Sequence, residues 1–282
     1  MPGGREARIE GTWAGVRLAG VSLAGKETWF HVPSMNLLLD VGRCPTEAVA
    51  VPDLFLSHAH LDHAAGVAYW CSQRRLGRVA GGVVRTEPST VPAWRELLSL
   101  HAALEGVTYD ARVEPIAPGE SVLLRKDLSV GAFAVSHRVP ALGFVAQEVR
   151  HRLRAAWRGK PQAEIRQAIA SGEEVSEAVS IPILAYSGDT APDFFRLAPE
   201  AARRARVLLL ECSFLEPGHR GRAAEWGHLH LDDVAEHADL LENEVVLLTH
   251  LTLRTRPDEI RRLVSSRLPA RLASRAVPFL PG

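Results

Sequence analysis

Short runs of apolar and β-branched residues recur along the chain and predict β-strands. The predicted strands cover Asn36 to Asp40, Asp53 to Ser57, Leu128 to Val135, Pro182 to Tyr186, Val207 to Glu211 and Glu244 to Thr249. Each run stops at or just before a polar residue, so the strand ends are the first places to look for chemistry.

Segments with a helical spacing of apolar residues lie between these strands. We predict helices over His63 to Leu76, Pro92 to Leu104, Leu231 to Leu241 and Pro257 to Leu268. The third opens with Asp232 and Asp233, carboxylates that suit the positive end of a helix dipole. Strands mixed with helices in this way indicate an α/β or α+β fold and exclude a helix bundle.

The sequence contains neither a repeat of about 20–50 residues nor a Gly/Ser-rich linker, so we predict one domain over residues 1–282. One segment, at about 148–174, is locally basic around the sequence Gly-Lys-Pro. We interpret it as a short basic insertion that protrudes from the domain. Its basic residues are Arg150, Arg152, Arg154, Arg158, Lys160 and Arg166.

Composition narrows the class of protein. With 282 residues, 46% of them hydrophobic and 23% charged, the chain can bury a large core, which argues against disorder. No run approaches the roughly 18 apolar residues of a membrane span, the start lacks an export signal, and the 3 cysteines form no C-x-x-C pair. We therefore expect a cytoplasmic protein without a membrane partner. Basic and acidic residues balance at 33 each, so any nucleic-acid contact must come from local patches.

The strongest chemical signal is the sequence Ser-His-Ala-His-Leu-Asp-His at residues 57–63. It places three imidazoles and one carboxylate directly after an apolar strand, and these ligands suit zinc-type cations. In a tight loop, His58 and His60 can bind one ion while Asp62 and His63 bind a second beside it. The alternative is a solvated histidine-rich turn, which this combination of residue types makes less favourable.

Two ions need more ligands than one loop supplies, and further candidates stand at other strand ends. They are His137, Asp189 in a Ser-Gly-Asp-Thr turn, and His250. Each alone is more often structural, since an aspartate in such a turn commonly caps backbone N–H groups. Together with the loop at 57–63 they indicate a dinuclear metal site.

These motifs resemble the metallo-β-lactamase fold, an αββα sandwich in which two β-sheets lie between outer helices and the metals sit at one sheet edge. Over nearly the whole chain the sequence is similar to ribonuclease Z, the family of endonucleases that trim 3′ trailers from precursor tRNA, and especially to its short plant-type form. The resemblance rests on residues 33–45, 57–63, 136–137, 143–144, 187–190, 211–214, 227–230 and 249–250.

The resemblance implies a zinc-dependent hydrolase with two Zn²⁺ per chain; Mn²⁺ suits the same ligands. It assigns His58, His60 and His137 to one ion and Asp62, His63 and His250 to the other, with Asp189 bridging. Asp62 also counts among the catalytic residues. The resemblance further implies a homodimer.

Metal ions do not supply a proton for the departing ribose oxygen, so hydrolysis of RNA calls for a general acid. His228 matches a histidine of ribonuclease Z, and Glu211 matches the glutamate that orients and charges it. The alternative is that His228 is an ordinary loop residue and that Glu211 is satisfied by backbone N–H groups. The Glu–His pair favours a phosphodiester over a thioester or lactone.

A large RNA needs basic side chains for its phosphates, and the insertion lies where ribonuclease Z carries its tRNA-binding arm. Candidate contacts are Arg150, Arg152, Arg154, Arg158, Lys160 and Arg254; the alternative is a solvated helix face. Phe144 replaces the tyrosine usual in the family, and residues 251–255 keep only Arg254 of a Ser-x-Arg-Tyr pattern. Trp157 and Trp226 are candidates for base stacking, although tryptophans mostly pack in cores.

The leading hypothesis is an endonuclease of the ribonuclease Z type that leaves a 3′-hydroxyl on the tRNA. A second hypothesis keeps the metal chemistry but assigns a small phosphodiester, a cyclic nucleotide or another ester as substrate. It is motivated by the neutral charge balance, the short insertion and the altered segment around Thr252. A third, a metal-bound fold without turnover, would be expected to lose ligands.

Overall fold

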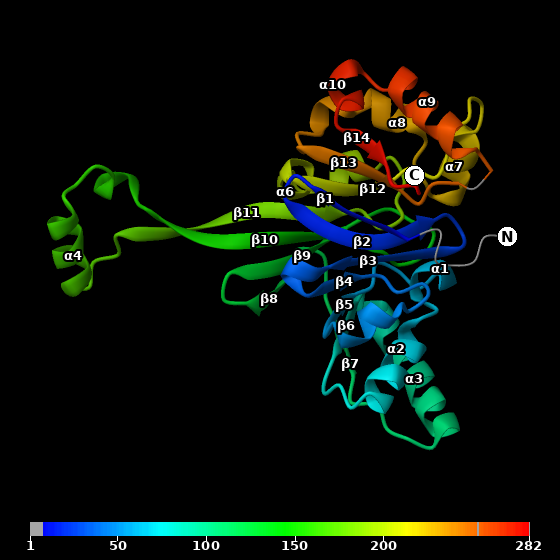
Figure 1. Ribbon diagram of the computed structural model, residues 1–282, viewed down its shortest axis with the longest axis horizontal. Helices are drawn as coiled ribbons and strands as arrows, with labels where there is room; N and C mark the ends of the chain where they lie inside the picture. The colour runs from blue at the N-terminus through cyan, green and yellow to red at the C-terminus, as the bar shows by residue number, and fades with distance from the viewer. Residues whose placement is uncertain (1–7, 253, 282) are drawn as a thin grey trace.

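The described residues, 8–252 and 254–281 of a computed structural model, form two seven-stranded β-sheets packed face to face between layers of helices (Figure 1). The first sheet contains β1 (Ile9–Trp13), β2 (Val16–Leu23), β3 (Glu27–Val32), β4 (Leu37–Leu39), β5 (Asp53–Phe55), β6 (Val83–Thr86) and β7 (Arg112–Pro115), in that spatial order. The predicted αββα sandwich is therefore confirmed.

The second sheet runs in the spatial order β14-β13-β12-β11-β10-β9-β8. Its strands are β8 (Ser121–Arg125), β9 (Leu128–Ala134), β10 (Leu142–Leu153), β11 (Ser176–Tyr186), β12 (Val207–Glu211), β13 (Val245–Thr249) and β14 (Ala276–Pro278). Strands β11 to β14 are parallel, so their carboxyl ends meet at one edge of the sheet.

Alternation of side chains along the short central strands builds the layers. In β4, Leu37 and Leu39 point into the core between the sheets, while Leu38 packs against the outer helices. In β12, Leu209 faces the core between the sheets and Leu208 faces the outer helices. Burial on both faces explains why these strands read as continuous apolar runs.

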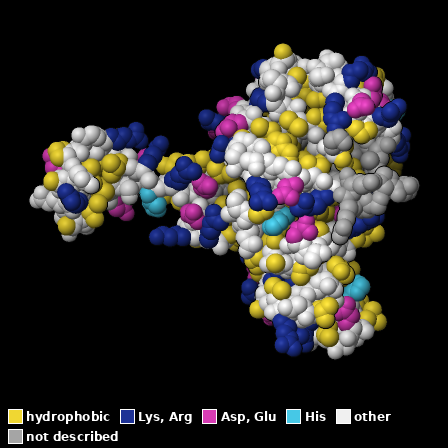
Figure 2. Space-filling view, in the orientation of Figure 1, with side chains coloured by type: hydrophobic (Ala, Val, Ile, Leu, Met, Phe, Trp, Pro, Cys, Tyr) yellow, Lys and Arg dark blue, Asp and Glu magenta, His cyan; other side chains and the backbone are white. Residues whose placement is uncertain are grey.

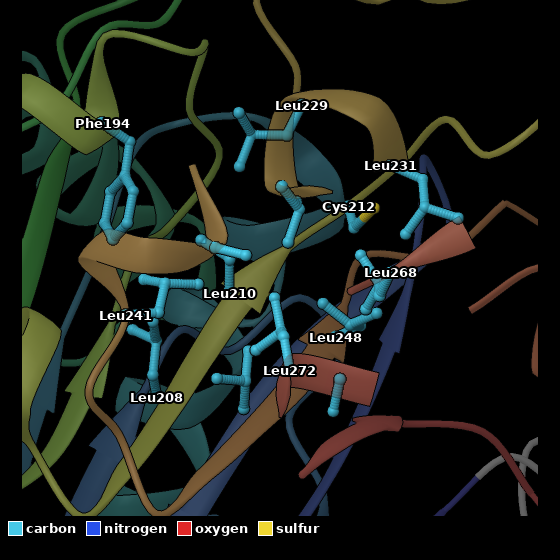
Figure 3. Packing of buried hydrophobic residues seen from close by; sticks show 14 of the residues in the cluster. Phe194, Leu208, Leu210, Cys212, Leu229, Leu231, Leu241, Leu248, Leu268 and Leu272 are labelled. Carbon is cyan, nitrogen blue, oxygen red and sulfur yellow. The ribbon is translucent and has the colours of Figure 1, made fainter. Parts of the chain in front are cut away.

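Helices cover the outer face of each sheet. The first sheet is covered by α2 (Val67–Leu76) and α3 (Val91–Glu105), which follow the short α1 (Leu61–Ala64). The second sheet is covered by α5 (Phe194–Leu197), α6 (Glu200–Arg204), α7 (Arg220–Trp226), α8 (Leu231–Glu236), α9 (Pro257–Arg267) and α10 (Ala270–Ala273). Figure 3 shows leucines of β12, β13 and the outer layer packed together in one cluster that also contains Phe194 and Cys212. No helix among the described residues is long and apolar enough to cross a membrane.

Two predicted helices are each split in two. The segment from His63 to Leu76 breaks at Gly66, where a Cβ would lie 2.3 Å from the carbonyl oxygen of Val41. The segment from Leu231 to Leu241 becomes α8 followed by the 3₁₀ turn η5 (Ala238–Leu240). The other 3₁₀ turns are η1 (Pro33–Met35), η2 (Thr46–Ala50), η3 (Pro88–Thr90) and η4 (Ala155–Trp157).

Strands β10 and β11 extend well beyond the sheet. β9 pairs with β10 only as far as Glu148, whereas β10 continues to pair with β11 as far as Leu153 opposite Ser176. The two strands carry η4 and α4 (Gln162–Ala170) away from the sandwich, at the left of Figure 1. We call residues 149–180 the arm; the predicted insertion at about 148–174 lies within or beside it.

Candidate metal centre

Four loops that follow strands meet at one edge of the two sheets. The loop after β5 carries His58 and His60 and leads into α1, where His60 is the N-cap. His137, Asp189 and His250 follow β9, β11 and β13 of the other sheet. Each of these residues follows a strand whose buried apolar side chains fix where that strand lies in the sandwich. The fold therefore brings together residues that lie up to 192 positions apart in the sequence.

The first group of potential ligands consists of His58, His60, His137 and Asp189, whose ligand atoms all lie within 4.8 Å of one another. His60 Nδ1 is 3.0 Å from His58 Nε2 and 3.3 Å from His137 Nε2. Asp189 Oδ2 lies 3.7 Å from His58 Nε2. Three imidazoles and a carboxylate that converge in this way can hold one divalent cation.

A second group lies beside the first and consists of Asp62, His63 and His250. His250 Nε2 is 3.2 Å from Asp62 Oδ2, and His63 Nε2 is 3.8 Å from the same oxygen. Asp189 touches this group too, because its Oδ1 is 3.4 Å from His63 Nε2 and its Oδ2 is 3.4 Å from His250 Nε2. The structure thus brings together all seven residues that the sequence predicts as ligands, with Asp189 between the groups.

Two atoms at the centre show that these side chains fit a metal. His63 Nε2 and Asp189 Oδ1 are buried and have no hydrogen-bond partner among the described residues. An unsatisfied buried polar atom normally costs about 1–3 kcal/mol, so native folds rarely leave two of them facing each other. A divalent cation bound between the groups would use both atoms as ligands.

The protonation of the cluster points the same way. Burial, together with neighbouring imidazoles, lowers the pKa of His58, His60 and His137, so these rings are neutral and offer a lone pair. Burial alone would raise the pKa of Asp189, but His250 and His63 hold it well below its usual value. Neutral imidazoles and ionised carboxylates are the forms that bind metal. At His63, burial lowers the pKa, but Asp189 and Asp40 raise it well above its usual value, so a cation would have to displace the proton of this ring.

Hydrogen bonds behind the imidazoles aim their Nε2 atoms inward. His63 Nδ1 donates to Asp40 Oδ2 at 2.8 Å, and His137 Nδ1 donates to the carbonyl oxygen of Gly227 at 2.9 Å. His58 Nδ1 lies 3.0 Å from Ser57 Oγ, which donates to Asp40 at 2.7 Å. Such partners fix the tautomer and the orientation of a metal-binding histidine.

His250 is held by a matching relay on the opposite side of the centre. Its Nδ1 lies 2.8 Å from Ser213 Oγ, which donates to Glu211 Oε2 at 3.0 Å. Asp40 and Glu211 are both fully buried, and each serves one histidine through a serine. Glu211 is predicted from the sequence, whereas the roles of Asp40 and Ser213 are not. The signal for Asp40 was its place at the end of β4, next to β5 in the sheet.

Asp62 has a backbone partner that the sequence did not indicate. The N–H of Gly25, in the turn between β2 and β3, donates to Asp62 Oδ2 at 2.9 Å. Gly25 has a φ of 64°, in the left-handed region that glycine adopts readily. The turn therefore holds a predicted ligand that is partly exposed.

We expect Asp40→Asn to weaken metal binding by about 10- to 100-fold, since the amide cannot accept all the hydrogen bonds that orient His58 and His63. Asp40 has a φ of 56°, which asparagine tolerates, so the backbone need not change. Competition of the protein with a chromophoric chelator measures the affinity. Asp53→Asn, which removes a carboxylate paired with Arg85 at the start of β5, is the matched control. Equal metal affinity in Asp40→Asn and the native protein would refute this role.

His228 lies next to the cluster and is paired with Glu211. Its Nδ1 is 3.0 Å from Glu211 Oε1, and its ring centroid is 5.3 Å from that of His250. Burial lowers the pKa of His228, but the charge and hydrogen bond of Glu211 outweigh it and raise the pKa to about 9. Glu211 also accepts hydrogen bonds from the N–H groups of Ser213 and Leu229. The same carboxylate therefore pairs with His228 and satisfies backbone N–H groups, so the two interpretations of Glu211 are compatible.

A cavity of about 300 Å³ opens beside His228 and His250. Its wall includes Trp226, Arg222 and Arg254, so the structure places Arg254 near the centre. Leu253, within the altered segment 251–255, lies outside the described residues. Phe144, which replaces the family's tyrosine, is buried in the core with its ring centroid 5.3 Å from that of Phe55.

The remaining predicted contacts lie on the arm and not at the metal centre. Most of these basic side chains are paired with carboxylates: Arg150 with Glu148 at 2.6 Å, Arg152 with Glu177 at 2.7 Å, Arg154 with Glu174, and Lys160 with Glu164 at 3.7 Å. Arg158 Nε donates to the carbonyl oxygen of Leu153 at 3.3 Å. Figure 2 shows basic and acidic side chains interleaved along the arm. The pairs are exposed, so RNA phosphates can compete for these cations at small cost.

Comparison with known proteins agrees with the fold. Residues 35–251 match the family described as "Beta-lactamase superfamily domain". The metallo-β-lactamase fold protein YhfI from Bacillus subtilis superposes with a TM-score of 0.61 at 16% identity, over 91% of this chain and 92% of that one. Human tRNase Z, short form, superposes with a TM-score of 0.58 at 17% identity, over 87% and 94%. The chain is a member of the β-lactamase superfamily.

Proteins with similar sequences identify the family to which the chain belongs within this superfamily. The chloroplastic tRNase Z TRZ2 of Arabidopsis thaliana is 32% identical over 99% of this chain and 80% of its own length. tRNase Z TRZ1 of the same plant is 31% identical over 95% of this chain and 96% of its own. The chain belongs to the ribonuclease Z, or tRNase Z, family.

Proposed function

We propose that this protein is a dinuclear zinc endonuclease that removes 3′ trailers from precursor tRNA. The observation that carries the proposal is the joint placement of two groups of metal ligands and the His228–Glu211 pair beside them. A proton donor next to two cations is what cleavage of an RNA phosphodiester requires, because the departing ribose oxygen is a poor leaving group.

The proposal keeps the division of ligands that the resemblance implies. His58, His60 and His137 would hold one Zn²⁺, Asp62, His63 and His250 would hold the other, and Asp189 would contribute to both sites. When bound, the two cations supply an activated water and neutralise charge on the phosphate. Mn²⁺ suits the same side chains, so metal analysis of the purified protein decides between the ions.

The side chains of this protein supply the rest of the chemistry. Asp62 and Asp189 keep the centre anionic, so that cations bind it in preference to protons. His228 gives its proton to the 3′-oxygen as the bond from phosphorus to that oxygen breaks. The attacking water loses one proton to the solvent, and its oxygen forms the new bond to phosphorus. The products are a 3′-hydroxyl on the tRNA and a 5′-phosphate on the trailer. Glu211 orients His228 and favours its charged form.

The activity should fall as pH rises through the pKa of His228, which Glu211 raises to about 9, since only the imidazolium can donate a proton. Glu211→Gln removes the charge that raises this pKa, so the alkaline limb of kcat should move to lower pH. The measurement is single-turnover cleavage of precursor tRNA against pH, with metal content checked in both proteins. An alkaline limb that stays in place would show that Glu211 does not charge His228.

The arm is proposed to bind the body of the tRNA. Replacing Arg150, Arg152 and Arg154 by alanine should raise KM for precursor tRNA and lower the slope of log KM against log salt, by up to about one for each phosphate that is no longer neutralised. Turnover of bis(p-nitrophenyl) phosphate should not change, because this ester does not reach the arm. An unchanged salt slope would refute the contacts.

The homodimer implied by the resemblance also stays a proposal, which sedimentation analysis of the native protein can test.

The expected cytoplasmic location is a proposal as well, since the relatives include a chloroplastic tRNase Z of Arabidopsis thaliana and a nuclear ribonuclease Z of Triticum aestivum. Fluorescence microscopy of the tagged protein in its own cells would decide the compartment.

A second candidate function is hydrolysis of a small phosphodiester, cyclic nucleotide or other ester. It is favoured by the arm, whose cations are mostly paired within the protein, and by the small volume of the cavity at His228. This function keeps the metal chemistry and makes the arm dispensable.

The test is to incubate the zinc-loaded protein with an end-labelled precursor tRNA and to map the product ends. Asp62→Ala serves as the inactive control, and bis(p-nitrophenyl) phosphate is assayed in parallel. Cleavage at the trailer junction that Asp62→Ala abolishes supports the endonuclease. Turnover of the small ester alone supports the second function, and inactivity toward both substrates with metal bound would refute both.

A further inference from the structure

We infer that the cavity beside His228 is a nucleotide subsite, in which Trp226 stacks on the base of the last nucleotide retained by the tRNA. This inference rests on the proposed function. It assigns Trp226 a positioning role and says which of the two nucleotides flanking the cut lies in the cavity.

The side of the cut follows from the proton donor. A general acid must lie within about 2.6–3.2 Å of the oxygen that it protonates. That oxygen is the 3′-oxygen of the last retained nucleotide, so this ribose lies against His228. His228 forms part of the wall of the cavity, which places the base of the same nucleotide in it. The first nucleotide of the trailer, on the far side of the phosphate, has no such constraint.

The dimensions of the cavity suit one nucleotide. Its volume of about 300 Å³ lies at the lower end of the range for small-molecule sites, roughly 300–1,000 Å³. Phe214 and Trp226 supply apolar wall, and the polar atoms come from Ser213, Thr252 and two arginines. An aromatic wall with a few polar groups is typical of sites that bind bases without reading their sequence.

Trp226 is available for stacking. Its side chain is 46% exposed, unlike Trp29 and Trp70, which are buried in the core. The guanidinium of Arg138 lies 4.7 Å from the centroid of the Trp226 ring, and Arg138 is not one of the residues that line the cavity. An indole with a cation over one face can still stack on a base with its other face, and the cation strengthens such a platform.

The platform is fixed relative to the metal centre. Trp226 is the last residue of α7, and Gly227, with a φ of 71°, caps the helix. The carbonyl oxygen of Gly227 accepts the hydrogen bond from His137 Nδ1 at 2.9 Å. The hydrogen bond that orients His137 therefore also fixes the backbone directly after Trp226, and His228 follows two residues after Trp226.

Charge around the cavity completes the subsite. Arg222 and Arg254 line it and form no ion pair with a carboxylate of the described residues, in contrast to most cations of the arm. Guanidinium groups that line the same cavity as the indole suit the 5′-phosphate of the nucleotide whose base stacks there. The cavity thus offers a partner for each part of one nucleotide.

The experiment compares precursor tRNAs that carry an abasic residue at the last retained position or at the first trailer position. The native protein should cut the first abasic substrate with a KM about 5- to 150-fold higher than the intact one, and the second with little change. Trp226→Ala should raise KM for the intact substrate by a similar factor and make it insensitive to the missing base. Trp226→Phe should restore most of the preference, and Tyr69→Ala, which removes an exposed aromatic ring on α2, should behave as the native protein.

Native protein that cuts both abasic substrates equally well would overturn the inference, even if Trp226→Ala fails to fold. So would a Trp226→Ala variant that loses the same factor on intact and abasic substrates, since that indicates a purely structural role. A native protein that binds metal but cuts no precursor would refute the proposed function itself, which separates the two failures.

Discussion

Asp189→Asn is expected to lower the rate of precursor tRNA cleavage by about 10⁴-fold or more, the loss of several kcal/mol of metal-supplied stabilisation. Asp189 is 2% exposed, and its two oxygens lie between the two groups of proposed metal ligands. An amide has no charge and only one acceptor oxygen, so it cannot bridge two cations. The bound metal should therefore fall from two ions per chain to one or fewer.

Metal analysis and single-turnover kinetics on the same preparation test this expectation. Asp193→Asn is the matched control, because Asp193 is exposed four residues further on and pairs with Arg196. It should keep both ions and full activity. Two ions per chain and undiminished cleavage in Asp189→Asn would show that Asp189 does not bridge.

The convergence of the seven candidate ligands could be predicted from the sequence because each of them closely follows an apolar strand. Apolar runs such as those before Glu211 and His250 are long enough to define the strand, and the ends of parallel strands necessarily meet at one sheet edge. The motif at residues 57–63, with its three histidines and one aspartate, then indicated metal binding. The fold and the place where the candidate ligands meet could thus be predicted from local sequence patterns, and the resemblance to a known family pointed to the same residues.

The orienting groups could not be predicted because they depend on contacts between distant segments. Asp40 reaches His63 and Ser57 only after β4 and β5 pair, and Gly25 reaches Asp62 through the backbone of a turn that has no distinctive side chain. The ion pairs of the arm's arginines could not be predicted either, because Arg152 and Glu177 become neighbours only when β10 pairs with β11. The antiparallel strands β1 to β3 were missed because their apolar positions include Gly20 and Ser22.

His228→Ala is expected to separate proton donation from metal chemistry. On precursor tRNA it should lower kcat by about 10²- to 10⁴-fold, the usual contribution of a general acid. On bis(p-nitrophenyl) phosphate it should have little effect, because p-nitrophenolate leaves readily without a proton. The ratio of the two rates is the measurement, and metal content must remain at the native value.

The contrast between the substrates is what identifies the role. His228 contacts Glu211 and lies against the ring of His250, so its removal could also disturb the metal centre. Such a disturbance would slow both substrates to the same extent and would refute the assignment. His219→Ala, which removes an exposed histidine at the N-cap of α7, controls for a local change in this segment and should cut both substrates at the native rate. Because His228 also lines the cavity, a change in nucleotide binding would raise KM, whereas a missing proton on the ribose oxygen lowers kcat. A loss of kcat on RNA alone therefore identifies His228 as the proton donor.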